Sequence, residues 1–283
     1  MNLKLIPING YEISYLDQGK GFPVIFVHGS LSDYRSWGDQ TEYFNKKYRT
    51  IVLSLRHSYP EIWDGKGGYF SIRQHVQDLS EFINALNIGP VHLVGHSRGG
   101  AVVLKMASIY PNLFRTAVLA DPAPFSQLFL ANSEGIKAIE KRNDIVGKSL
   151  GLMDRGEMDK GLELFTDAVS TPGTWKKLPE TVKQIRRDNA FSLKSLISDA
   201  REPLSCEDVK KIFNPVLLIT GENSPPVYGM MHQKLQSCLR NYQSATVSNA
   251  SHVMHRDNPA AFNAVVSDFL NKNSKESGVS RPI

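Results

Sequence analysis

The chain has 283 residues, of which 41% are hydrophobic and 22% are charged. This balance is ordinary for a globular protein, and the length suits one large domain or a domain with an insertion. Since no run of 18 apolar residues occurs, we expect no membrane-spanning helix and no stable association with a membrane.

The net charge of +5 and the sequence pI of ≈ 9.1 raise the question of a nucleic-acid partner. The clustered basic residues form only small pairs, at Lys46-Lys47, Lys176-Lys177, Arg186-Arg187 and Lys210-Lys211. These pairs are scattered along the chain. We interpret them as solvated surface and expect no nucleic-acid partner.

The amino terminus lacks the apolar core of a signal peptide and runs directly into a strand-like pattern, which favours a cytoplasmic location. Cys206 and Cys238 stand apart from each other and match no metal-binding spacing. We therefore expect both cysteines to be reduced and structural, and we expect no bound metal.

The first part of the chain alternates between strand and helix patterns. Asn9-Gly10 lies between two alternating runs, which is a strong hairpin signal. A helix from Ser71 to about Leu86 carries its apolar residues on one face. The remaining segments before residue 121 are predicted strands at 3–8, 11–17, 22–28, 50–55, 90–94 and 115–120, helical spacing at 33–47, and a helix after Gly99.

The second part begins with a long stretch that has no strand pattern, residues 124–205, in which glycine and proline interrupt helical patterns. The strand rhythm then resumes at 216–220 and 242–247, with helices predicted at 227–240 and 258–270. Because strands and helices alternate on both sides of this stretch, we predict an α/β protein with a mostly parallel sheet of about eight strands. Helices are expected on both faces.

We divide the chain accordingly. Residues 1–123 and 206–273 form the predicted α/β core, and residues 124–205 form a helical cap inserted into it. Residues 274–283 are polar and are predicted to be a flexible tail.

The pentapeptide Gly95-His96-Ser97-Arg98-Gly99 lies between a predicted buried strand and an Ala/Val-rich helix. This G-x-S-x-G pattern is typical of a nucleophile elbow, in which the serine occupies a sharp, strained turn. Glycines two positions either side let the strand and the helix approach closely, and the helix start directs backbone N–H groups toward the serine. The motif and its context predict a functional Ser97.

Further motifs follow other predicted strands. They are His28-Gly29-Ser30 after an early strand and Ser251-His252, with His255-Arg256-Asp257-Asn258-Pro259, near the end. With the pentapeptide, they make the chain resemble the α/β-hydrolase fold superfamily over nearly its whole length, as a serine-nucleophile member with a helical cap.

The resemblance implies roles for individual residues. Ser97 is the expected nucleophile and His252 the expected base, with His255 as a competitor. The oxyanion hole would use the backbone N–H groups of Ser30 and Arg98. His28 and His96 adjoin the glycines of these loops and are expected to shape them.

A serine nucleophile and a histidine base are usually completed by a carboxylate that orients the histidine. The sequence leaves more than one candidate for this acid. Many members of the fold carry Gly-x-x-Asp after the penultimate long strand, but here that position is Ser224. Glu222 is close by, and Asp121 follows the strand after the elbow helix, where some members of the fold place the acid. We favour Asp121 and keep Glu222 as the alternative; a catalytic dyad or another acid is also possible.

The resemblance and the serine together imply hydrolysis of an ester-type bond through an acyl-enzyme, without metal or organic cofactor. The expected substrate is a small molecule, and an apolar pocket lining would make it hydrophobic. The residues available for that lining, or for the cap's own core, are Phe125, Leu128, Phe129, Leu130, Met153, Phe165 and Trp175.

Two alternatives remain, namely hydrolysis of a carbon–carbon bond in a diketone and a small-molecule receptor with little turnover. For the oligomeric state we expect a monomer or a homodimer.

Overall fold

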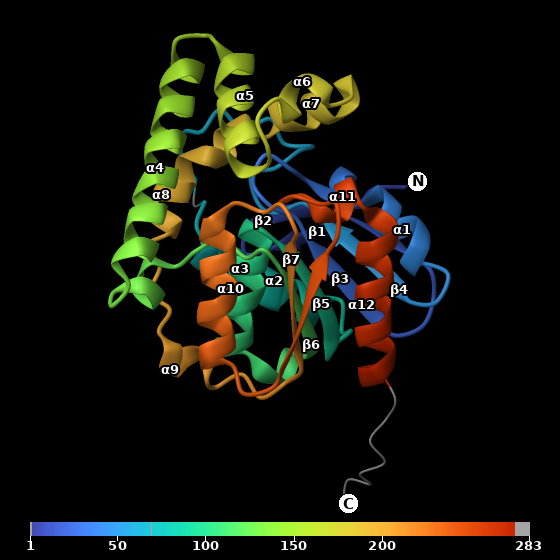
Figure 1. Ribbon diagram of the computed structural model, residues 1–283. Coiled ribbons are helices and arrows are strands. Elements are labelled where there is room, and N and C mark those ends of the chain that lie inside the picture. Colours follow the sequence, from blue (N-terminus) through green and yellow to red (C-terminus); the bar gives the residue numbers. More distant parts are fainter. Residues whose placement is uncertain (1, 69, 275–283) are drawn as a thin grey trace, which may run out of the picture.

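The computed structural model describes residues 2–68 and 70–274, and its core is a twisted sheet between helices (Figure 1). The sheet has the strand order β1-β2-β4-β3-β5-β6-β7-β8. The strands are β1 (Lys4–Ile8), β2 (Tyr11–Gln18), β3 (Pro23–Val27), β4 (Arg49–Leu53), β5 (Val91–His96), β6 (Phe114–Ala120), β7 (Val216–Gly221) and β8 (Tyr242–Val247).

Strands β1 and β2 form the predicted hairpin, with Ile8 opposite Tyr11, and β2 also runs antiparallel to β4. Every other pairing is parallel. The mostly parallel sheet predicted from the alternating pattern is therefore confirmed, and the segments that follow its parallel strands all emerge at one edge.

Helices cover both faces of the sheet. On one face α2 (Ile72–Ala85), α3 (Arg98–Ile109) and α10 (Pro226–Cys238) pack against inward side chains such as Ile25 and Val27. On the other face α1 (Gly38–Phe44) and α12 (Pro259–Ser274) pack against Val24 and Phe26. Neighbouring residues of β3 thus enter different cores, because side chains alternate between the two faces of a strand.

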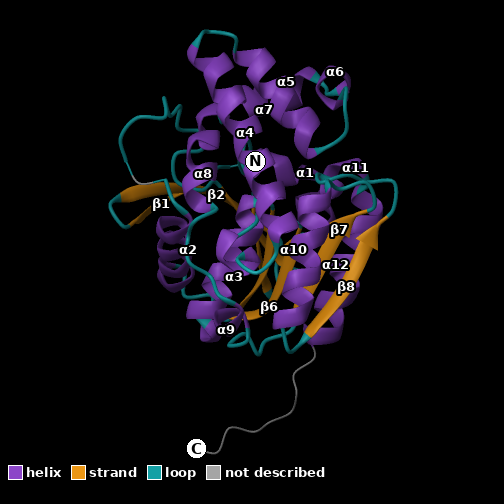
Figure 2. Cartoon of the chain, turned by 60° about the vertical axis from the view of Figure 1, so that its left-hand side comes forward, coloured by secondary structure: helices purple, strands orange, loops and turns teal. Residues whose placement is uncertain are grey.

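Residues 124–205, here called the helical insertion, contain helices and no strand. Figure 2 shows α5, α6 and α7 at the end of the molecule toward which β8 points. The elements of the helical insertion are η3 (Ser126–Phe129), α4 (Ser133–Asp154), α5 (Met158–Val169), α6 (Thr174–Lys177), α7 (Glu180–Asp188), η4 (Ala190–Ser195) and α8 (Leu196–Asp199).

The expected interruption of helices by glycine holds only in part. Helix α4 continues through Gly135, Gly147 and Gly151, whereas Gly156 and Gly173 lie between helices with φ of 84° and 81°. In α4 the spaced residues Ile139, Val146 and Met153 are buried, and this packing outweighs the low helix propensity of glycine.

The remaining short elements connect the larger ones. They are η1 (Tyr34–Trp37), η2 (Pro111–Leu113), α9 (Cys206–Val209) and α11 (Met254–Asp257). Ser274 ends α12, and the rest of the predicted tail lies outside the described residues.

The expectation of reduced cysteines is wrong. Cys206 at the start of α9 and Cys238 at the end of α10 form a disulfide, with their Cα atoms 5.3 Å apart. Sequence spacing could not reveal the bond, because the packing of α9 against α10 brings together residues 32 positions apart.

Candidate active site

Ser97 lies at the sharp turn between β5 and α3. Its backbone has φ 52° and ψ −119°, a region that non-glycine residues rarely adopt. The Ser97 N–H donates to the Ala120 carbonyl at 2.9 Å, and the Ser97 carbonyl accepts from the Ala123 N–H at 2.9 Å. A Cβ on Gly95 would lie 2.5 Å from the Gly99 carbonyl oxygen. The glycines therefore permit the close contact that holds the strained serine in place.

Asp121 and His252 meet at the same edge of the sheet. Asp121 directly follows β6 with φ 42°, and its Oδ2 lies 3.3 Å from Nδ1 of His252. Both side chains are buried. The alternative acid, Glu222, is exposed and accepts from the Asn249 N–H at 2.7 Å. Of these two carboxylates, the structure brings only Asp121 to the imidazole.

Ser224 also contacts Asp121. Its hydroxyl donates to Oδ2 at 2.6 Å, and it accepts from the Gly221 N–H at 3.1 Å. This serine occupies the position at which many members of the fold carry aspartate. The loop after β7 therefore supplies a donor to a carboxylate that comes from β6.

Two other histidines hold the surrounding loops. The Nε2 of His96 donates to the carbonyl of His252 at 2.8 Å, and Nε2 of His28 accepts from the Leu55 N–H at 2.9 Å. The ring of His255 lies 4.5 Å from the ring of Trp37. Among the described residues, the Asp121 carboxylate forms its hydrogen bonds with His252 and Ser224 and none with His255.

The loop after β3 lies against the elbow. A Cβ on Gly29 would be 3.0 Å from Cβ of Ser97. Across the described ranges, the backbone N–H groups of Ser30 and Arg98 have no hydrogen-bond partner. Arg98 is the first residue of α3, where the helix dipole is positive. Two donors are thus free beside Ser97.

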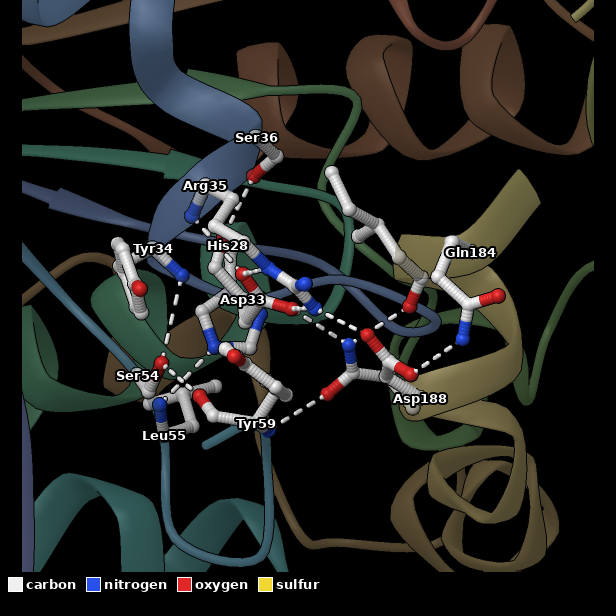
Figure 3. A network of polar contacts seen from close by, with 12 residues as sticks. His28, Asp33, Tyr34, Arg35, Ser36, Ser54, Leu55, Tyr59, Gln184 and Asp188 are labelled. Atoms are coloured by element: carbon white, nitrogen blue, oxygen red, sulfur yellow. Dashed lines mark hydrogen bonds and ion pairs between the residues drawn. The ribbon is translucent and has the colours of Figure 1, made fainter. Parts of the chain in front are cut away.

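A polar network joins the loop after β3 to the helical insertion (Figure 3). The buried carboxylate of Asp33 accepts from Nε and Nη2 of Arg35 at 2.9 and 2.7 Å, and from the Asn189 amide at 2.6 Å. Nη2 of Arg35 also donates to Asp188 at 2.7 Å. The network therefore connects the loop that carries Ser30 with the end of α7.

The side chain of Arg98 makes a second connection. Its guanidinium is buried, forms an ion pair with Asp199 of α8 and donates to the Ser195 hydroxyl at 2.7 Å. Asp199 also accepts from the Ile72 N–H at 3.1 Å. Sequence reasoning gave the Arg98 side chain no role, because its partners are about 100 residues away.

Tyr228 of α10 was not identified from the sequence. Its ring stacks on His252 with the centroids 3.9 Å apart, and the Arg142 and Ser97 side chains act on the pKa of its hydroxyl. Burial raises the pKa of Tyr228 to about 12, so the phenol is protonated at neutral pH. No motif surrounds this tyrosine, so the sequence offered no signal for it.

Burial is the main cause of the pKa shifts of His252 and Asp121. It lowers the pKa of His252 to about 3, with further lowering by the positive charges of Arg142 and Arg186. It raises the pKa of Asp121 to about 6, against the opposing effect of the Ser224 hydrogen bond. The imidazole is therefore neutral at neutral pH and can accept a proton. In the described part of the chain it makes no hydrogen bond to the Ser97 hydroxyl.

The apolar residues proposed for a pocket lining lie elsewhere. Phe125, Leu128 and Phe129 belong to the main core beneath the sheet face, and Leu130 is exposed. The other three residues, Met153, Phe165 and Trp175, lie in the core of the helical insertion. These residues therefore give no support to a hydrophobic substrate.

Within residues 2–68 and 70–274, no group of three His, Cys, Asp or Glu side chains could hold a metal ion. The same residues include no helix that is long and apolar enough to span a membrane.

The model of the Alpha/beta hydrolase family matches residues 24–265. The match covers most of the sequence, and the chain belongs to this family. Its fold and its sheet topology agree with that membership.

Among curated proteins, the chain is 25% identical over 275 residues to a protein of Bacillus subtilis named as a 2-succinyl-6-hydroxy-2,4-cyclohexadiene-1-carboxylate synthase, covering 93% of this chain and 96% of that protein. It is 24% identical to a 2-hydroxy-6-oxo-2,4-heptadienoate hydrolase of Pseudomonas putida, covering 94% and 95%. Among solved structures, a thermophilic esterase from Thermogutta terrifontis with bound malate has a TM-score of 0.75 at 21% identity, covering 96% and 99%. This last likeness shows the shared fold.

Proposed function

We propose that the protein hydrolyses an ester-type bond, a carboxylic ester, thioester or lactone, through a triad of Ser97, His252 and Asp121. The observation that carries the proposal is the buried pairing of Asp121 with His252, 3.3 Å apart, at the sheet edge that also bears the strained Ser97. A serine, an imidazole and a carboxylate that orients it are the groups that acyl transfer requires.

In the proposed reaction, Oγ of Ser97 attacks the carbonyl carbon while its proton passes to Nε2 of His252. The N–H groups of Ser30 and Arg98 stabilise the oxyanion. The bond from the carbonyl carbon to the leaving oxygen, or to the leaving sulfur of a thioester, then breaks, and the imidazolium gives its proton to the leaving alcohol or thiol. Water, deprotonated by the same imidazole, then attacks the acyl-enzyme. The bond from the acyl carbon to Oγ breaks, the imidazolium returns its proton to Oγ of Ser97, and the acid is released. Asp121 accepts from Nδ1–H and holds the required tautomer. These steps need neither a metal nor an organic cofactor.

The helical insertion serves as a cap in this proposal. Its support is the pair of connections described above, from Asp188 and Asn189 to the loop of Ser30 and from Asp199 to Arg98. The first connection ends at Asp33 and Arg35 in the segment that follows Ser30, and the second ends at the side chain of Arg98. A cap fixed there can position a bound substrate relative to Ser97 and exclude water.

Covalent labelling and steady-state kinetics test the proposal. Wild-type protein should react with a fluorophosphonate at Ser97 and hydrolyse 4-nitrophenyl acetate, and Ser97→Ala should lose both. Ser108→Ala, a serine on the same helix away from the elbow, serves as the control and should keep both. Labelling at another residue, or full ester hydrolysis by Ser97→Ala, would contradict the assignment.

Hydrolysis of a carbon–carbon bond is the second candidate, favoured by the similarity to the heptadienoate hydrolase over 94% of the chain. The same serine would act on a ketone carbonyl instead of an ester. A direct comparison of kcat/KM for an aryl ester and for a vinylogous 1,5-diketone acid discriminates the two. A receptor with little turnover would instead hydrolyse both slowly and gain thermal stability from its ligand.

A further inference from the structure

Two arginines of the helical insertion are buried without an ionic partner. Arg142 of α4 is 9% exposed and Arg186 of α7 is 6% exposed. The Nε–H of each is buried and has no hydrogen-bond partner. Within the described residues neither guanidinium forms a salt bridge, whereas the buried Arg56 and Arg98 pair with Asp78 and Asp199.

Such an arrangement is costly for the protein alone. Removing a charge from water without a counter-charge is unfavourable, and buried cations are normally paired. Burial lowers the pKa of Arg186 only to about 10, and it also lowers the pKa of Arg142. A guanidinium keeps its proton in proteins near neutral pH, so both side chains carry a positive charge. Two unpaired buried cations in one small insertion therefore indicate a ligand that supplies the missing negative charge.

Both cations act on the proposed active site. The charge of Arg142 acts on the phenol of Tyr228, whose ring stacks on His252, and it also acts on His252 itself. The charge of Arg186 acts on His252 and on His96.

Other charges nearby do not neutralise the pair. Arg186 is repelled by Arg256 and attracted by Asp257, an exposed carboxylate that accepts from Ser251 at 2.8 and 2.6 Å. Asp121 already accepts from His252 and Ser224.

The donors match one kind of group. A guanidinium offers Nε–H and Nη–H along one edge, which fits the two oxygens of a planar carboxylate. We propose that Arg142 and Arg186 form a carboxylate-binding subsite beside Ser97, so that the natural substrate is an ester, thioester or lactone that also carries a carboxylate. This inference rests on the proposed function of Ser97 for the reaction, but the binding it describes does not require turnover.

A matched pair of esters tests the subsite. 4-Methylumbelliferyl glutarate carries a free carboxylate, and 4-methylumbelliferyl 5-methylhexanoate replaces it with an isopropyl group of the same shape. Wild-type protein should show a kcat/KM roughly tenfold or more higher for the glutarate ester, as expected for a charged hydrogen bond. Equal or lower kcat/KM for the glutarate ester would overturn the proposal.

Variants locate the effect. Arg142→Gln and Arg186→Gln should each lower the ratio of the two kcat/KM values by roughly tenfold or more. Lys148→Gln, which removes an exposed cation from the same helix as Arg142, should leave the ratio unaltered. An equal loss on both esters in the arginine variants would mean that the arginines only maintain the fold, and would contradict the subsite.

Binding and stability provide readouts that do not depend on hydrolysis. Calorimetry should detect glutarate binding to Ser97→Ala and no binding when Arg142→Gln is added. Absence of binding to Ser97→Ala would overturn the subsite, whereas hydrolysis by Ser97→Ala would overturn only the proposed triad. Since an unpaired buried charge destabilises the free protein, Arg142→Met should unfold at the wild-type temperature or above it, and a decrease of several degrees would count against the proposal.

Discussion

At the scale of single residues, one carboxylate oxygen organises the candidate site. Oδ2 of Asp121 accepts from His252 and from Ser224, which come from two different loops. Together these donors fix the direction of the carboxylate, and the carboxylate fixes the imidazole. The acid can therefore follow β6 while the position after β7 carries only a hydroxyl.

Replacement of each candidate acid by the corresponding amide tests this arrangement. Asp121→Asn should lower kcat for 4-nitrophenyl acetate by about 10⁴-fold, because the amide stabilises the wrong tautomer of His252. Glu222→Gln is the matched control and should remain close to wild type, since Glu222 only accepts from the Asn249 N–H. The opposite result in steady-state kinetics would assign the acid to Glu222.

The pH dependence of hydrolysis is a second prediction at this scale. A base must be unprotonated, and burial with two nearby arginines lowers the pKa of His252 to about 3. The acid limb of kcat/KM for 4-nitrophenyl acetate should therefore lie below the ordinary histidine value near 6.5. Arg186→Gln removes one repulsive charge and should move that limb to higher pH. A wild-type limb at 6.5 or above would contradict the prediction.

At the scale of elements, polar side chains join the helical insertion to the core at several places, among them Leu31 with Ser192 and Lys105 with Glu202. Helix α7 is joined to the loop after β3 through Asp188 and Asn189, and α8 is joined to α3 through Asp199 (Figure 3 shows the first connection). The insertion also has its own apolar core, which includes Val146, Leu162 and Trp175. It is thus built to keep its shape while polar side chains attach it to the site.

The disulfide between α9 and α10 is expected to contribute to the stability of the protein. Closing a loop between residues 32 apart restricts the unfolded chain, and the chain-entropy model gives about 4 kcal/mol for it. Urea unfolding of Cys206→Ser should show a loss of up to that size, and reductant should destabilise the wild type but not the variant. Two free thiols in the native protein would contradict the bond.

At the scale of the whole molecule, buried histidines set the response to acid. Burial lowers the pKa of six of them, namely His28, His75, His92, His96, His252 and His255. In the unfolded chain these groups titrate near 6.5, so below that pH the unfolded state binds more protons than the native state. The free energy of unfolding must then fall as the pH falls.

Thermal unfolding between pH 7.5 and 5 measures this effect. Each such histidine contributes a slope of about 1.4 kcal/mol per pH unit once the pH is well below 6.5. Asp121 has the opposite effect on the free energy of unfolding. Because its pKa is raised to about 6 from 3.8, the native state binds one more proton than the unfolded state at this carboxyl between these two pH values. The melting temperature should decrease steeply below pH 6.5. A melting temperature independent of pH over this range would show that the histidines are not buried neutral.

Location and assembly also belong to this scale. The cytoplasmic location and the state as monomer or homodimer stay predictions. The boundaries of core and cap stay predictions as well, although the strand-free stretch 124–205 is a feature of the structure.

The sequence by itself determined the order of the elements and the loops that could carry chemistry. Apolar runs at alternating or continuous spacing predicted most strands of the sheet, because burial on one or both faces dictates those patterns. The strand at 242–247 was also predicted, although most of its residues are exposed. Gly95 and Gly99 around Ser97 predicted the elbow, since no other residue permits so close an approach of strand and helix. Local rules were sufficient wherever the cause was local.

Only the tertiary structure decided which distant side chains meet. Asp121 and Glu222 were both plausible in the sequence, and the parallel pairing of β6 with β7 brings one of them to His252. The disulfide joins residues 32 apart, and the stacking of Tyr228 joins it to His252, which is 24 residues away. Arg142 and Arg186 act on the same histidine from 110 and 66 residues away. No periodicity records such contacts, because they depend on how helices pack after the chain has folded.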